Sequence, residues 1–214
     1  VSGGMVLMSY VLPTGCQRVK TMSVNATPAA ISGVTETCDG TTTVLNNTTP
    51  GGIWTSSNTS VALADIAGGI ITGMMPGTAT VNYTLSTGCK SSTTVTIHNN
   101  PAAISGSTNL CAGNSAVLTN ATLGGVWSSA DDAVAMVSGA GVLSGVAAGN
   151  TTVTYQLTTT GCYRTASVAV NSLPDMKNVT GGGSYCAGGA GVGIGLDASQ
   201  TATSYKLYRA GTGL

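Results

Sequence analysis

The chain has 214 residues, of which 42% are hydrophobic, 7% charged and 4% aromatic, and its basic and acidic side chains cancel. This much Val, Ile, Leu and Ala without net charge is typical of a folded chain and excludes a disordered one. Because no basic run is present, and no stretch approaches the roughly 20 apolar residues of a membrane helix, we expect no nucleic-acid partner and no membrane insertion in this segment.

The sequence repeats with a period of 73 residues. Pro28 to Gly33 returns as Pro101 to Gly106, and Trp54 returns as Trp127. Tandem units of this size without linkers form extended arrays, so we expect neighbouring repeats of the same chain to be the main partners and the chain to be part of a longer protein. The period predicts four segments: 1–27, the C-terminal part of one domain; 28–100 and 101–173, two whole domains; and 174–214, the N-terminal part of a further, variant sandwich domain.

Short β-strands are predicted along the whole repeat. In 1–27, apolar residues from Val6 to Leu12 alternate with other residues, which predicts the first strand of a hairpin. The first whole unit shows the same alternation in 78–85, followed by a turn with Cys89. Six to seven such strands per unit, with turns about every ten residues and no helical spacing, favour a two-sheet sandwich. The further strands expected in that unit are 42–45, 53–55, 62–66, 70–72 and 93–97.

The aromatic residues of the repeat are interpreted as core anchors. Trp54 and Tyr83 belong to predicted strands of the first unit, and Trp127 and Tyr155 occupy the corresponding strands of the second. Large aromatic side chains supply much of the buried area of a small core. The alternative is that the two indoles form a ligand platform on the surface.

Two sets of motifs carry a family resemblance. Gly52 to Asn58 and Gly69 to Gly73 have counterparts in Gly125 to Ser129 and Gly141 to Gly145. These motifs resemble bacterial Ig-like domains of the intimin and invasin type. The repeated cysteines also resemble those of tandem domains in very large cell-surface proteins of Bacteroidota. The resemblance implies tandem Ig-like β-sandwich domains in an extended array, in a secreted or cell-surface protein, with no enzymatic activity.

Six cysteines follow the repeat. Cys38 and Cys89 are 51 residues apart, and so are Cys111 and Cys162. The equal spacing predicts one disulfide per domain, Cys38 with Cys89 and Cys111 with Cys162. Such a crosslink stabilises a small domain by about 4 kcal/mol and implies an oxidising, extracellular setting.

The remaining two cysteines, Cys16 and Cys186, are expected to find no partner within the 214 residues. A zinc site is the alternative for the repeat cysteines, although they lack CxxC spacing and partner histidines.

Other chemical motifs are weak. His98 is the one histidine of the sequence, and the second unit has Asn171 in its place, which disfavours a general base. Asp131-Asp132 is interpreted as a solvated loop, with a calcium site as the alternative. Gly193 to Ala198 fits the dinucleotide pattern GxGxxA without a surrounding βαβ pattern. We therefore predict no catalytic residue, no cofactor and no metal.

The sequence favours the shaft of a bacterial surface adhesin or surface fibre. Prolines at the junctions, Pro28 and Pro101, stiffen the links between units. One alternative is a self-assembling filament subunit that joins identical chains. The other is an Ig-like module that binds a surface glycan or partner through loops such as 46–52. The exposed aromatic residues that such binding usually needs could be supplied here by Tyr163, Tyr185 and Tyr208.

Overall fold

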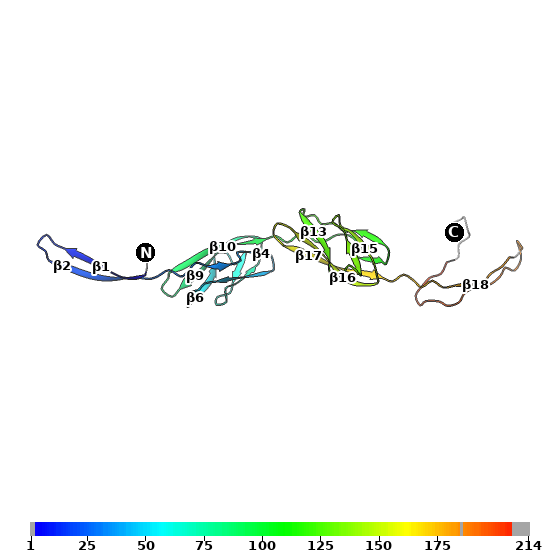
Figure 1. Ribbon diagram of the computed structural model, residues 1–214, viewed down its shortest axis with the longest axis horizontal. Coiled ribbons are helices and arrows are strands. Elements are labelled where there is room, and N and C mark those ends of the chain that lie inside the picture. The colour runs from blue at the N-terminus through cyan, green and yellow to red at the C-terminus, as the bar shows by residue number, and fades with distance from the viewer. Residues whose placement is uncertain (1–2, 185, 207–214) are drawn as a thin grey trace.

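The computed structural model describes residues 3–184 and 186–206, and every regular element in them is a β-strand. Figure 1 shows the strands gathered into successive segments along one line, from a hairpin at one end to a thin segment with β18 at the other. The predicted all-β class and extended tandem array are therefore confirmed. The described part of the chain contains no helix long and apolar enough to cross a membrane.

A two-stranded hairpin opens the array. Strand β1 (Gly4–Val11) pairs antiparallel with β2 (Gln17–Val24), and every residue of β1 is exposed. The alternation predicted from Val6 to Leu12 thus forms a strand, but its apolar face lies open among the described residues. The large exposed side chains of this hairpin are Met5, Val6, Leu7, Met8, Tyr10, Val11, Leu12, Val19 and Met22.

The strands from β3 to β10 form the first unit, a sandwich of two four-stranded sheets. One sheet has the order β4-β10-β9-β6, and the other β3-β5-β8-β7. Within the first sheet, β4 runs parallel to β10, whereas the other neighbours are antiparallel. The bounds are β3 (Ser32–Gly33), β4 (Glu36–Cys38), β5 (Thr42–Asn46), β6 (Gly52–Ser56), β7 (Ala62–Ala64), β8 (Ile70–Gly73), β9 (Gly77–Leu85) and β10 (Lys90–His98).

Strict alternation along the long strands builds the core of this unit. In β9, Ala79, Val81 and Tyr83 are buried while the residues between them face outward, as period two requires. Both sheets contribute side chains to one continuous cluster, which is the apolar interior of the sandwich. Its buried members are Leu45, Trp54, Val61, Ala62, Ile71, Ala79, Val81, Tyr83, Val95 and Ile97.

The second unit, formed by β11 to β17, repeats this architecture. Its sheets have the orders β11-β17-β16-β13 and β12-β15-β14, and a single bridge between Ser105 and Thr119 stands where β3 pairs with β5. Its buried core includes Leu118, Leu143 and Val153. The bounds are β11 (Asn109–Cys111), β12 (Ser115–Val117), β13 (Gly125–Ser129), β14 (Ala135–Val137), β15 (Val142–Gly145), β16 (Gly149–Leu157) and β17 (Tyr163–Asn171).

The backbone geometry requires the glycine that ends the repeated Pro-Ala-Ala-Ile-Ser-Gly motif. Gly33 and Gly106 both have φ of 121°, a backbone conformation that residues with a side chain rarely adopt. A Cβ on Gly33 would lie 2.4 Å from the carbonyl oxygen of Val44, and one on Gly106 2.3 Å from that of Val117. The first segment of each unit can approach its neighbouring strand only because these positions carry no side chain.

The last described segment contains one small antiparallel pair. Strands β18 (Val179–Gly181) and β19 (Ile194–Leu196) are largely exposed. Gly193 to Ala198 thus lies on and beside a strand, with no helix after it in the described residues. A dinucleotide site needs a strand-to-helix turn at this motif, so the pattern is a chance match.

The predicted disulfide pairing was wrong. The structure bonds Cys38 to Cys162. Cys38 is paired with His98 at the end of β10, whereas Cys89 comes immediately before Lys90 at the start of the same strand. A nine-residue strand separates its ends by about 27 Å, while a disulfide needs Cα atoms about 4.4–6.8 Å apart.

The same geometry separates the other predicted pair. Cys111 is paired with Asn171 at the end of β17, and Cys162 comes just before Tyr163 at its start. The two cysteines of each unit therefore lie at opposite ends of its sandwich. A crosslink within either unit is geometrically excluded.

Candidate functional site at the junction of the two units

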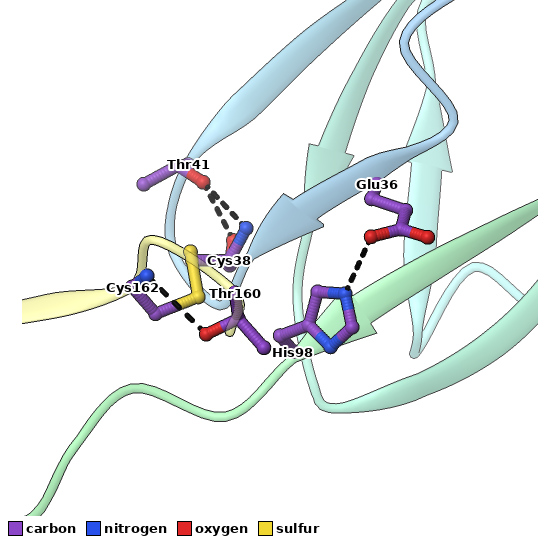
Figure 2. Close-up of polar contacts among 6 residues, drawn as sticks. All are labelled: Glu36, Cys38, Thr41, His98, Thr160 and Cys162. Carbon is purple, nitrogen blue, oxygen red and sulfur yellow. Dashed lines mark hydrogen bonds and ion pairs between the residues drawn. A yellow bond between two sulfur atoms is a disulfide. The ribbon is translucent and has the colours of Figure 1, made fainter. Parts of the chain in front are cut away.

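The disulfide joins the two sandwiches to one another. Cys38 ends β4 of the first unit and Cys162 lies in the turn before β17 of the second, with their Cα atoms 5.7 Å apart. The bond closes a loop of 124 residues in sequence. Figure 2 shows the sulfur bridge beside the strand pair formed by β4 and β10. The junction is therefore covalently fixed at a second point besides the chain itself.

Hydrogen bonds hold Cys38 in place at the end of β4. The Thr41 hydroxyl donates to the Cys38 carbonyl over 2.7 Å and accepts from the Cys38 amide over 3.0 Å. The next residue, Asp39, donates its amide to the carbonyl of His98 over 3.0 Å. These bonds complete the tight turn after β4, and the Cys38 sulfur points toward the second unit, where it is bonded to Cys162 (Figure 2).

Cys162 is fixed by the hairpin turn between β16 and β17. Its amide donates to the Thr160 hydroxyl over 3.3 Å, and its carbonyl accepts from the amide of Leu157 over 2.8 Å. The residue is 0% exposed. Its sulfur is therefore packed inside the junction, where a dissolved reductant has little access.

Polar contacts flank the disulfide on the side of the first unit. His98 Nε2 lies 3.1 Å from Glu36 Oε2, and this pair joins the last residue of β10 to the first residue of β4 (Figure 2). The corresponding residues of the second unit, Asn171 and Asn109, are joined by a hydrogen bond from amide to amide oxygen over 2.5 Å. Since an amide pair does the same work, the role that this structure gives His98 is to tie two parallel strands together.

The link between the units is also bonded to both of them. The Asn100 side-chain amide donates to the Asp39 carbonyl of the first unit over 2.8 Å. The guanidinium of Arg164 in the second unit donates to the carbonyl of Pro101 over 3.1 Å. Pro101 itself is fully buried. A buried proline with a fixed φ leaves little slack at the junction.

The predicted core anchors lie in equivalent places. Trp54 is directly opposite Tyr83 across β6 and β9, with ring centroids 4.8 Å apart, and Trp127 is opposite Tyr155 at 4.7 Å. Trp54 is 4% exposed, while Trp127 is half-buried and packs against the second core. The two indoles belong to the interiors of separate units.

The candidate binding loop 46–52 uses its polar groups internally. The Asn47 side chain donates to the carbonyl of Ala29 over 2.6 Å, and the Tyr83 hydroxyl donates to the carbonyl of Thr49 over 2.6 Å. Tyr163, one of the aromatic residues considered for glycan contact, is exposed on β17. The other two, Tyr185 and Tyr208, lie outside the described residues.

Asp131 has a structural role in its loop. Its carboxylate accepts the amide of Ala133 over 3.0 Å, as the side chain of Asn58 accepts the amide of Ser60 over 3.1 Å in the first unit. Across residues 3–184 and 186–206, no group of three or more His, Cys, Asp or Glu residues could hold a metal ion.

Four cysteines are unbonded in the described chain. Cys16 and Cys186 are exposed, whereas Cys89 and Cys111 are half-buried. The sequence signal that could have revealed this arrangement was the position of each cysteine relative to the long last strand of its unit. The equal spacing of 51 residues reflects the length of the unit and not a contact.

No protein-family model matches the sequence, and no curated protein matches it. Among solved structures, the chain is similar to domains 1–6 of the surface layer protein SbsC, with 17% identity and a TM-score of 0.32 over 83% of this chain and 37% of that one. It is also similar to a C-terminal 282-residue fragment of intimin, solved with the intimin-binding domain of the translocated intimin receptor, with 15% identity and a TM-score of 0.43 over 73% and 66% of the two chains. A third similar structure is mouse cadherin-23 EC22-24, with 12% identity, a TM-score of 0.30 and coverage of 73% and 70%.

Proposed function

We propose that this chain is a structural segment of the shaft of a bacterial surface adhesin or surface fibre. The observation that carries the proposal is the Cys38–Cys162 bond, which locks one sandwich unit to the next. A segment that holds a distal tip away from a cell needs junctions that neither bend freely nor separate under load. The disulfide, the buried Pro101 and the bonds of Asn100 supply such a junction.

The chemistry of the bond supports an extracellular location. Disulfides persist in oxidising compartments, and a small unit with a marginal core benefits from a covalent tie. Each unit keeps its own core, and the link is made of a few polar contacts and one sulfur bridge. The function follows from length and stiffness, delivered by repeated units.

The location is tested by protease treatment of intact source cells. Brief digestion, followed by mass spectrometry of the released peptides, should recover peptides of this chain while a cytoplasmic marker stays inside the cells. If peptides of this chain appear only after lysis, together with the marker, the proposal of a surface shaft is wrong.

A further inference from the structure

We propose that the Cys38–Cys162 bond is one instance of a crosslink made at every junction of this repeat. Cys111 and Cys89 would each supply one cysteine of the crosslinks at the two neighbouring junctions. Cys111 would bond the turn cysteine of a unit that follows, and Cys89 the strand cysteine of a unit that precedes. The partner in both cases is another sandwich unit of the same kind. Below, the strand cysteines are Cys38 and Cys111, and the turn cysteines are Cys16, Cys89 and Cys162.

The two strand cysteines occupy the same place in their units. Cys38 is in register with His98, and Cys111 with Asn171, each at the end of the long last strand. Each carbonyl accepts the amide of the residue three positions later, Thr41 or Asn114, over 3.0 Å. Cys38 lies at the end of the first unit that faces the next unit along the chain. Cys111 therefore lies at the corresponding end of the second unit.

The three turn cysteines are equally alike. The carbonyl of each accepts the amide of the leucine at or just after the end of the preceding strand, over 2.9 Å for Cys16, 2.9 Å for Cys89 and 2.8 Å for Cys162. The turn with Cys162 holds one residue more than the other two, yet the bond across its base is the same. Each turn cysteine thus lies at the end of its own unit that faces the preceding unit of the array.

The surroundings of Cys89 give an independent sign of its partner. Its sulfur lies 3.7 Å from the carbonyl oxygen of Asn25, just after β2. By the repeat, Asn25 corresponds to His98, the residue paired with Cys38 at the existing crosslink. Cys89 therefore lies beside the end of β2, in the position that corresponds to that of Cys162 beside the end of β10. A strand added parallel to β2, as β4 is to β10, would bring its final cysteine to the Cys89 sulfur.

The bond forms by ordinary thiol oxidation. Two thiols lose two protons and two electrons to become a disulfide, and a small-molecule disulfide such as oxidised glutathione accepts them and becomes two thiols. The first thiolate displaces one thiol of the oxidant to form a mixed disulfide, and the second thiolate then displaces the other. Sandwich units that sit end to end hold the two cysteines together for the second step.

The test is a variant of the full chain in which residues 101–173 are duplicated in tandem after Leu173. It is oxidised with glutathione disulfide, alkylated and mapped by mass spectrometry without reduction. We expect Cys111 to be bonded to the turn cysteine of the inserted copy, while the Cys38–Cys162 bond persists. A matched variant with serine at the inserted turn cysteine should leave Cys111 fully alkylated.

The persisting Cys38–Cys162 bond shows that the units have folded, so free Cys111 beside that bond would overturn the proposal. If the duplication disturbs folding, residues 28–100 are duplicated after Asn100 instead. Cys38 must then exchange Cys162 for the turn cysteine of the inserted copy, and the inserted strand cysteine must take Cys162. A Cys38 that remains bonded to Cys162 across the inserted unit, or that links to Cys89 of its own unit, would equally refute the rule.

Discussion

Tyr83 closes the loop that covers one end of the first sandwich. Its hydroxyl donates to the carbonyl of Thr49 over 2.6 Å and accepts the amide of Gly52 over 2.9 Å. Tyr83→Phe leaves both backbone groups without this partner, so the free energy of unfolding of the first unit should fall by about 1–3 kcal/mol. Urea unfolding followed by Trp54 fluorescence in a Trp127→Phe background measures it. Tyr10→Phe, at the corresponding place on the exposed hairpin, should change nothing.

Trp54 is the largest side chain of the first core and is 4% exposed. Its replacement by alanine leaves a large cavity in this core, and we expect a loss of about 3–5 kcal/mol in the free energy of unfolding. Trp127 is half-buried, so the same change in the second unit should cost less. Thermal unfolding of both variants checks the order. Equal losses would mean that exposure does not govern the contribution of these indoles.

At the scale of elements, the alternation of side chains predicted most of the strands, because period two follows directly from one face being buried. The long strands β9 and β10 and the place of Tyr83 on the buried face of β9 could be predicted in this way. The partner of Cys38 was not. It depends on β4 lying parallel to the end of β10, and this is a contact between an early strand and the last strand of the unit, about 60 residues apart in the sequence. A strand of only three residues, such as β4, shows too little alternation of side chains to predict which strand it pairs with.

The β1–β2 hairpin should be less protected than the strands of the two sandwich units. It has two strands and an open apolar face, and such a hairpin has little independent stability. Digestion of the folded chain with trypsin should therefore cleave after Arg18 and Lys20 well before it cleaves after Lys90. Lys90 begins β10, which is the counterpart of β2 in a closed sandwich. Cleavage at Lys90 as fast as at Arg18 would show that the first unit does not protect its last strand.

For the whole molecule, the disulfide changes the route by which tension passes along the chain. Force applied to the two ends reaches Cys38, crosses the sulfur bridge and continues from Cys162. The residues between them, which include β5 to β10 and β11 to β16, lie in a closed loop outside this path. Breaking the bond places all of these strands in the path. The redox state of one bond therefore sets how far the segment can lengthen.

Stretching single molecules by their ends tests this account most directly. In the oxidised chain, unfolding should release a contour length shorter by the 124-residue loop than in the reduced chain. At about 3.3–3.6 Å per residue the difference is roughly 410–450 Å. Cys38→Ser should behave like the reduced chain in either condition. If the oxidised and reduced chains release the same contour length, the disulfide does not bridge the two units and the locked-junction account is contradicted.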